Sequence, residues 1–171
     1  MGPTFRLKRT LKRHSVEKNA WFSPDGKYRY LLTRRWNRKL PTILFIGLNP
    51  STADKDNDDA TIRRLIGFAQ SWGFGGLKII NLYAYVAKNR QMLGRVADPV
   101  GPHNDHYFEM FKNKKNVVFM WGCSEYITPE ITKKAYETFR KPKCFGQNKD
   151  GLPWHPLYLD SKLRPKKFEF Y

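Results

Sequence analysis

Two polar residues of this chain lie where a site is expected. Asn49 comes directly after the apolar run 42–48, and His155 lies between two prolines in a late loop. The amide of Asn49 can cap a tight turn, or it can position a water molecule or a substrate group. His155 is either a loop residue in solvent or a hydrogen-bond donor in a site. The residue types alone leave both pairs of alternatives open.

An acidic cluster stands out in a basic chain and consists of Asp54, Asp56, Asp58 and Asp59. Its spacing resembles a calcium-binding loop, but Asp59 stands where glycine is required and Leu65 where glutamate is required, which excludes calcium. Asp58 and Asp59 directly precede a predicted helix and favour its positive end. A free carboxylate beside a strand-end loop can also act as a general base.

His103 and His106 are three residues apart, a spacing that one helix face can present, and the chain has two cysteines, Cys123 and Cys144. The cysteines lack the CxxC spacing of structural zinc sites. Isolated thiols in apolar surroundings are more often core residues. We therefore expect no metal. Two cysteines also exclude a disulfide framework and a four-thiolate cluster, so a reducing cytoplasm is expected.

The elements that must position these residues follow an alternating order. Short apolar runs predict buried strands at 42–48, 77–82, 116–121 and 143–145. Helical spacing and end signals predict helices at 60–72, 103–111 and 128–139. This order is typical of an α/β fold with a mostly parallel sheet. Ligands of such sheets bind outside the carboxyl ends of the strands, where Asn49 lies.

The first part of the chain, residues 1–41, carries twelve basic side chains and two acidic ones. Pro24-Asp25-Gly26 is a turn signal, because proline presets φ and glycine accepts a positive φ. We therefore predict a β-hairpin that follows a basic tail. The whole chain of 171 residues fits a single domain, with a basic arm at 1–41, an α/β core at 42–160 and a basic tail at 161–171.

The charge balance indicates the class of partner. The chain has 32 Lys and Arg against 15 Asp and Glu, a formal net charge of +17. Such an excess points to a polyanion, most simply DNA. No apolar stretch approaches the roughly 20 residues of a membrane span, so no membrane partner is expected. We expect a monomer, with DNA contacts from Arg34, Arg35, Arg63 and Lys149.

Several of these segments, in this order, resemble motifs of the uracil-DNA glycosylase superfamily. They are the loop Gly47-Leu48-Asn49-Pro50-Ser51, the strand end Ile79-Ile80-Asn81-Leu82, the strand end at 117–122 and the late pair His155-Pro156. Closer still, the segments 49–54, 61–64 and 97–102 resemble a small bacterial and phage family catalogued as a domain of unknown function, thought to be a branch of that superfamily.

The resemblance implies a three-layer α/β/α sandwich around a four-stranded, mostly parallel sheet and a monofunctional DNA glycosylase without a cofactor. Asn49, assisted by Asp54, Asp58 or Asp59, would position the attacking water, and His155 would donate a hydrogen bond to the departing base. Asn81 would bind the base edge. Further substrate contacts are implied for Pro50, Ser51, Tyr83, Tyr85, Trp121, Gly122, Leu157 and Tyr158.

The chain departs from the superfamily in its second motif, which reads His-Pro-Leu-Tyr-Leu without the usual serines. We therefore expect a flipped, modified pyrimidine with a polar 5-substituent rather than plain uracil, and abasic DNA as the product. Excision from phage DNA would suit such an activity. The alternatives are a non-catalytic nucleic-acid-binding protein and an enzyme that acts on a free mononucleotide.

Overall fold

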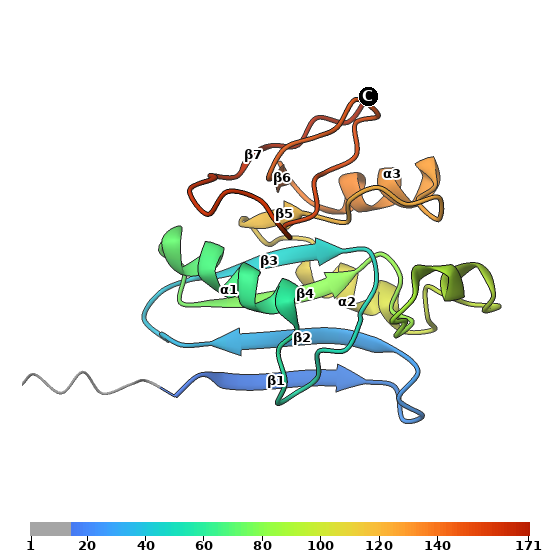
Figure 1. Ribbon diagram of the computed structural model, residues 1–171, viewed down its shortest axis with the longest axis horizontal. Coiled ribbons are helices and arrows are strands. Elements are labelled where there is room, and N and C mark those ends of the chain that lie inside the picture. The colour runs from blue at the N-terminus through green and yellow to red at the C-terminus, as the bar shows by residue number, and fades with distance from the viewer. Residues whose placement is uncertain (1–14) are drawn as a thin grey trace, which may run out of the picture.

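The computed structural model describes residues 15–171, in which one sheet carries helices on both faces (Figure 1). The elements follow in the order β1 (Glu17–Phe22), β2 (Arg29–Arg35), β3 (Thr42–Gly47), α1 (Ala60–Ser71), β4 (Gly76–Asn81), the 3-10 helix η1 (Arg90–Gly94), α2 (Asn104–Phe111), β5 (Val117–Phe119), α3 (Pro129–Thr138), β6 (Lys143–Cys144) and β7 (Lys166–Lys167). The predicted α/β class is confirmed. The basic tail predicted before the hairpin lies outside the described residues.

The sheet of the described residues has seven strands in the order β1-β2-β4-β3-β5-β6-β7. Strands β4, β3, β5 and β6 pair in parallel, whereas β1 with β2, β2 with β4 and β6 with β7 pair in antiparallel fashion. The prediction of a four-stranded, mostly parallel sheet is therefore wrong in its extent, because both ends of the domain add strands to the sheet edges.

The predicted N-terminal hairpin is confirmed, but it is part of the sheet and not a separate arm. Its turn is held by the hydrogen bond from the Gly26 N–H to the Ser23 carbonyl at 2.9 Å, and Gly26 has a φ of 72°. Strand β2 then pairs with β4, and its Leu31 and Leu32 are buried. The basic side chains of β2 obscured this apolar content in the sequence.

The C-terminal segment also belongs to the fold. Strand β7 pairs with β6, and Phe168 directly after it is 1% exposed and packs against Phe119 and Trp121. The prediction of a basic tail at 161–171 is therefore wrong for the part that carries β7 and Phe168. The buried Phe168 and the pairing of β7 with β6 together attach a segment whose neighbours are lysines.

The helices cover the sheet in two layers (Figure 1). Helix α1 packs Leu65 and Phe68 against one face of the sheet, and α2 and α3 pack Phe108 and Ala135 into the core on the other face. Helix α1 begins at Asp59, whose side chain accepts the Ile62 N–H at 2.9 Å. This cap fixes the position at which the chain leaves the loop after β3.

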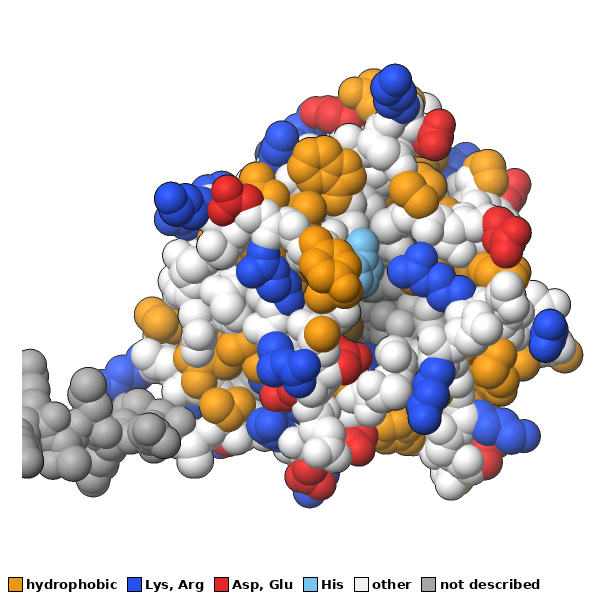
Figure 2. Space-filling model, in the orientation of Figure 1, with side chains coloured by type: hydrophobic (Ala, Val, Ile, Leu, Met, Phe, Trp, Pro, Cys, Tyr) orange, Lys and Arg blue, Asp and Glu red, His pale blue; other side chains and the backbone are white. Residues whose placement is uncertain are grey.

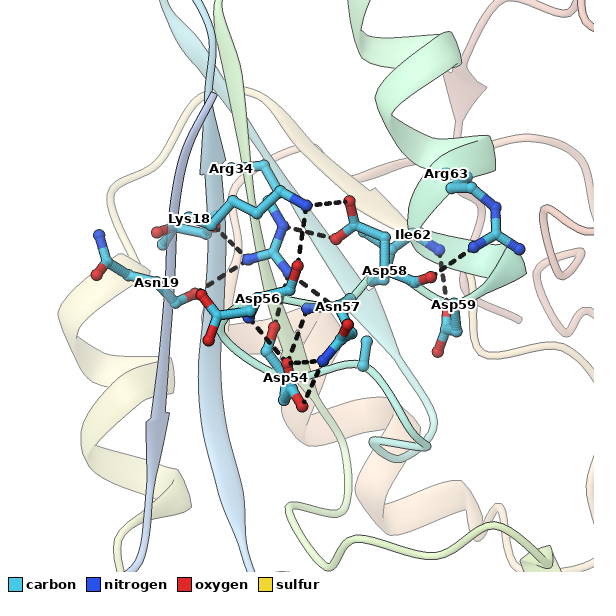
Figure 3. A network of polar contacts seen from close by, with 12 residues as sticks. Lys18, Asn19, Arg34, Asp54, Asp56, Asn57, Asp58, Asp59, Ile62 and Arg63 are labelled. Atoms are coloured by element: carbon cyan, nitrogen blue, oxygen red, sulfur yellow. Dashed lines mark hydrogen bonds and ion pairs between the residues drawn. The ribbon is translucent and has the colours of Figure 1, made fainter. Parts of the chain in front are cut away.

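A buried ion pair ties the hairpin to that loop (Figure 3). The side chain of Arg34 is 0% exposed, and its Nε donates to Asp58 Oδ1 at 2.7 Å. Its Nη2 donates to the Asp54 carbonyl at 2.7 Å. Lys18 lies 3.0 Å from the second oxygen of Asp58. Arg34 is thus fully engaged inside the protein, and its predicted contact with DNA is wrong.

Burial alone would raise the pKa of the Asp58 carboxyl, but hydrogen bonds from Arg34 and Lys18 outweigh burial and lower this pKa. A carboxyl whose pKa is lowered by folding stabilises the protein above its unfolded pKa of about 3.9. That contribution is lost as the pH falls through the lower pKa of the folded state. The ion pair therefore operates throughout the neutral range.

Removing this carboxylate is expected to be costly. Asp58→Ala leaves the Arg34 charge buried without a partner and should lower the free energy of unfolding at pH 7 by about 3–5 kcal/mol. Glu17→Ala is the matched control, because Glu17 and Arg38 form an exposed ion pair with the same N–O distance of 2.7 Å. It should cost less than about 1 kcal/mol. Equal losses in chemical denaturation of the two variants would contradict this account.

Candidate active site

A cavity of about 240 Å³ opens at the carboxyl edge of strands β3 and β4. We call it the carboxyl-edge cavity; its apolar floor includes Ile62, Ile79 and Met120. Its polar lining comes from side chains far apart in the sequence, namely Arg29, Asn49, Ser51, Asp59, Thr61, Asn81, Lys88, Arg90 and His155. The structure thus brings together Asn49, Ser51, Asn81 and His155, as the sequence predicted.

Asn49 is held by its amide nitrogen. The Nδ2 group donates to the Pro50 carbonyl at 2.9 Å and to the Ala87 carbonyl at 3.0 Å. Both N–H groups are therefore occupied, and Oδ1 is the part of the side chain left to act as an acceptor. Asn49 is held by the loop after β4 and is more than a simple turn cap. An acceptor fixed at a cavity wall can orient a water molecule.

Asn81 contributes a buried amide at the end of β4. It is 3% exposed, and its Nδ2 has no hydrogen-bond partner within the described structure. A Cβ atom at Gly47 would lie 2.7 Å from Asn81 Oδ1, so this close approach requires glycine at the end of β3. A buried donor without a partner is costly unless a ligand or water satisfies it. Asn81 is therefore suited to bind a polar ligand edge.

His155 reaches the cavity from the loop after β6. Its Nδ1 accepts the N–H of Leu157 at 3.3 Å, so the proton of the neutral ring resides on Nε2. Gly122 lies behind it, where a Cβ atom would come within 3.1 Å of the His155 Cβ. The histidine is half-buried in the site, which excludes the alternative of a loop residue in solvent.

Burial lowers the pKa of His155 below its usual value of 6.5, and repulsion by the Arg90 cation lowers it further. The Asp59 carboxylate opposes these effects but does not cancel them. At neutral pH the ring is therefore uncharged and presents an Nε2–H donor. Because the uncharged ring already carries this N–H group, it can donate a hydrogen bond to a departing group and stabilise the negative charge that develops there.

The carboxylate that lines the cavity is Asp59, whereas Asp54, which was predicted to assist Asn49, does not line it. Asp54 accepts hydrogen bonds from the backbone of Asp56 and Asn57 and closes its own loop (Figure 3). These bonds, those from Asn57 first, lower the pKa of the Asp54 carboxyl. Among the three aspartates that the sequence left open, Asp59 alone lines the cavity, because Asp58 is bound to Arg34.

Three cations of the cavity were not among the predicted site residues. Arg29 begins β2 and is buried at the floor, whereas Lys88 and Arg90 follow β4 and are exposed at the mouth. The sequence placed Arg29 within a basic arm, where it did not stand out. The available signal was its position next to the aromatic and apolar residues 30–32, which indicates a buried strand. Together with Asp59 these cations give the lining a net charge of +2, since 3 − 1 = 2.

The structure does not bring the aromatic side chains predicted to contact the substrate to the carboxyl-edge cavity. Trp121 is 0% exposed and lies in the core. Tyr83 is buried, donates its hydroxyl to the Tyr126 carbonyl and lines a different cavity between α2 and α3. Tyr85 packs edge-on against Tyr28. These side chains follow strand ends, but they pack on the face covered by α2 and α3 and do not line the carboxyl-edge cavity.

Pro50, Leu157 and Tyr158 were also predicted to contact the substrate. Pro50 is buried and acts through its carbonyl, which accepts the Asn49 amide and the Ala87 N–H at 3.0 Å. Leu157 holds His155 through its backbone. Tyr158 is 93% exposed with a φ of 67°, a conformation uncommon for tyrosine. An exposed aromatic ring three residues from His155 is suited to stacking on bases.

The remaining residues predicted from charge to contact DNA differ in their position relative to the cavity. Arg35 pairs with Gly76 at the start of β4, the edge opposite the cavity, and does not belong to the site. Arg63 and Lys149 are exposed, and Arg63 lies in the first turn of α1 beside the cavity residues Thr61 and Ile62. Figure 2 shows Lys and Arg side chains on either side of a hollow in which a histidine is visible.

Two further observations concern residues 15–171. No three His, Cys, Asp or Glu side chains of this region come together as a potential metal site. None of the helices described there combines the length and apolar character that crossing a membrane requires.

The fold and the cavity define an α/β protein with a polar, positively charged site at the carboxyl edge of parallel strands. The chain belongs to the family described as "Protein of unknown function (DUF1643)", whose model matches residues 29–157. The match includes every residue named above as lining the cavity. No curated protein and no solved structure matches the chain.

The electrostatics of His155 can be tested by NMR titration of its ring protons. The pKa of His155 should lie below 6.5, and Arg90→Gln should raise it because the repulsive cation is removed. Arg140→Gln removes an exposed arginine that does not line the cavity and should leave this pKa unchanged. A His155 pKa above 6.5, or one insensitive to Arg90, would contradict the assignment of a neutral ring.

Proposed function

We propose that this protein is a DNA glycosylase that hydrolyses the N-glycosidic bond of a flipped pyrimidine. The observation that carries the proposal is the convergence on one cavity of Asn49, Asn81 and His155, which are separated in the sequence by 32 and 74 residues. These are the three positions for which the resemblance to the uracil-DNA glycosylase superfamily implies the water-positioning, base-reading and base-stabilising roles. The parallel strands β4, β3, β5 and β6 would form the four-stranded sheet of that superfamily.

The size and lining of the cavity support a single base as the ligand. Its 240 Å³ is below the roughly 300–1,000 Å³ of sites that enclose drug-sized molecules. Apolar side chains form the floor, and the Asn81 amide offers a donor to a base edge. A base inside a duplex cannot reach such a cavity, so the nucleotide must flip, which costs a few kcal/mol. Phosphate contacts of Lys88, Arg90 and Arg63 would offset this cost.

The chemistry follows from the three polar groups. Asn49 Oδ1 and the Asp59 carboxylate hold a water molecule whose oxygen attacks the anomeric carbon, and Asp59 takes the proton. The carbon–nitrogen bond breaks, and its electron pair leaves with the base. The neutral His155 donates its Nε2–H hydrogen bond to the oxygen on which this charge collects. The products are a free base and an abasic site.

Four further properties are part of the proposal. The protein binds DNA, is a monomer, acts in the cytoplasm, and contributes to defence against phage DNA by excising modified pyrimidines. Tyr158 is proposed to stack in the space left by the flipped nucleotide, because its ring is exposed beside the histidine loop.

His155→Ala tests the proposed donor. It should lower the single-turnover rate of base release by about 10²-fold or more while DNA affinity stays nearly unchanged, because the hydrogen bond strengthens only as charge develops. His106→Ala, which removes an exposed histidine of α2 outside the cavity, is the matched control and should retain the wild-type rate. Excision by His155→Ala at the wild-type rate would remove His155 from the mechanism.

A second pair of variants separates the aspartates. Asp59→Asn keeps an N-cap of equal quality for α1 but removes the charge, and it should slow excision by about 10²-fold. Asp54→Asn, which removes a carboxylate outside the cavity, should have little effect on the rate. Thermal melts of both variants report on folding. If Asp54→Asn excises the base slowly and Asp59→Asn excises it at the wild-type rate, Asp54 and not Asp59 is the carboxylate that assists Asn49.

A further inference from the structure

Arg29 is a buried cation with unused hydrogen-bonding capacity. It is 3% exposed, and its Nη1 donates to the Ala53 carbonyl at 2.7 Å. Its Nε is buried with no partner, and no carboxylate of residues 15–171 lies within ion-pair distance of it. Arg34, the other buried arginine of β2, has an aspartate and several carbonyls around it. Arg29 therefore lacks the partner that its burial calls for.

The charge of Arg29 persists at neutral pH. Burial lowers its pKa to about 10, and the nearby Asp59 opposes this shift. A guanidinium with a pKa of about 10 is still protonated at pH 7. The lining of the cavity thus includes a permanent positive charge as well as the unpaired Nδ2 of Asn81.

The sheet order places Arg29 at one end of the site. The Arg29 N–H bonds to the Ala84 carbonyl at 2.9 Å, just beyond the end of β4, so Arg29 lies on the β2 side of Asn81. His155 lies against Gly122, which follows β5 on the opposite side of β3. Across the edge, the order is Arg29, Asn81, Asn49 and His155. A base bound with His155 near its glycosidic end would present its far end to Arg29.

We propose that Arg29 binds an oxyanion of the substrate, and that this oxyanion is an acidic substituent on the end of the base away from the glycosidic bond. The assignment rests on the proposed function and names its substrate class. Guanidinium groups have donors only and match a carboxylate or phosphate through two parallel hydrogen bonds. A base with an amino group at that end would leave Arg29 unpaired, so the site discriminates against it.

The lining charges agree with an anionic ligand. Arg29, Lys88 and Arg90 outnumber the single carboxylate of Asp59, which already accepts the Ile62 N–H as the cap of α1. The same oxyanion chemistry is offered by a phosphate of the DNA backbone. The position of Arg29 at the buried floor favours the substituent, because the exposed Lys88 and Arg90 lie nearer to where a backbone would pass.

The wild-type protein provides the first test, by calorimetric titration with three small probes: uracil, 5-carboxyuracil and inorganic phosphate. The 5-carboxyuracil should bind roughly 10- to 100-fold more tightly than uracil, as expected for a hydrogen bond to a charged group. If phosphate binds but 5-carboxyuracil binds no more tightly than uracil, Arg29 still binds an oxyanion, but that oxyanion is a phosphate of the DNA backbone. If neither probe binds more tightly than uracil, the proposal is wrong.

Variants then assign the effect to one side chain. Arg29→Gln should abolish the preference for 5-carboxyuracil, or the binding of phosphate if the site belongs to the backbone. Arg64→Gln is the matched control, because Arg64 of α1 also has a buried Nε without a partner but does not line the cavity. It should behave as wild type, and a preference that survives in a folded Arg29→Gln variant overturns the assignment.

These measurements need no bond cleavage and so separate the two proposals. If the protein releases no base but binds 5-carboxyuracil through Arg29, the proposal of a glycosylase is wrong and the proposal of an oxyanion site is supported. If the protein excises unmodified uracil from DNA as fast as 5-carboxyuracil, and Arg29→Gln excises both at the wild-type rate, the proposal of a glycosylase is supported and the proposal of an oxyanion site is wrong.

Discussion

The arrangement of the site depends on the way in which strand β2 holds the loop between β3 and α1. Two buried arginines of β2 bind this loop, Arg34 through Asp58 and the Asp54 carbonyl, and Arg29 through the Ala53 carbonyl. The loop begins with Asn49 and ends with the Asp59 cap of α1. A segment of this length with little regular structure would otherwise move, and its two polar ends would lose their fixed relation to each other.

The two arginines show how one strand can serve both stability and function. Arg34 has its charge paired and its donors occupied, which is the usual condition for a buried arginine. Arg29 holds the same loop with one nitrogen and keeps the Nε donor unpaired at the cavity. A buried polar group without a partner calls for an explanation, and a ligand bound in the cavity that Arg29 lines is one that fits this position. The unpaired Nε of Arg29 therefore adds to the convergence of Asn49, Asn81 and His155 as a reason to regard the cavity as a binding site.

The sequence predicted the central strands correctly and also the sheet edge at which Asn49 lies. Apolar runs located β3, β4, β5 and β6, and the rule for ligands at the carboxyl ends of parallel strands brought Asn49 to the right edge of the sheet. The family resemblance added Asn81 and a role for His155, which had already stood out between its two prolines. The strands and the sheet edge were predicted correctly because they depend on local periodicity and on topology, which the sequence expresses directly.

The sequence failed where burial is decided by tertiary partners. Arg29 and Arg34 were interpreted as part of a DNA-binding arm, since a basic residue gives no local sign that its partner lies in a distant loop. The roles of Asp54 and Asp59 were not separable by spacing, because both precede α1 and only the turn of the loop decides which one reaches the cavity. Trp121 and Tyr83 follow strand ends, but side chains alternate between the faces of a sheet, and theirs belong to the face covered by α2 and α3.

The most direct test of the account is mass analysis of the bases that the purified protein releases from genomic DNAs that carry different modified pyrimidines. We predict release of a free modified base, together with alkali-labile sites in the same DNA and in equal number. Binding of these DNAs without release of any base would contradict the account and would leave a protein that holds nucleic acid without cleaving it.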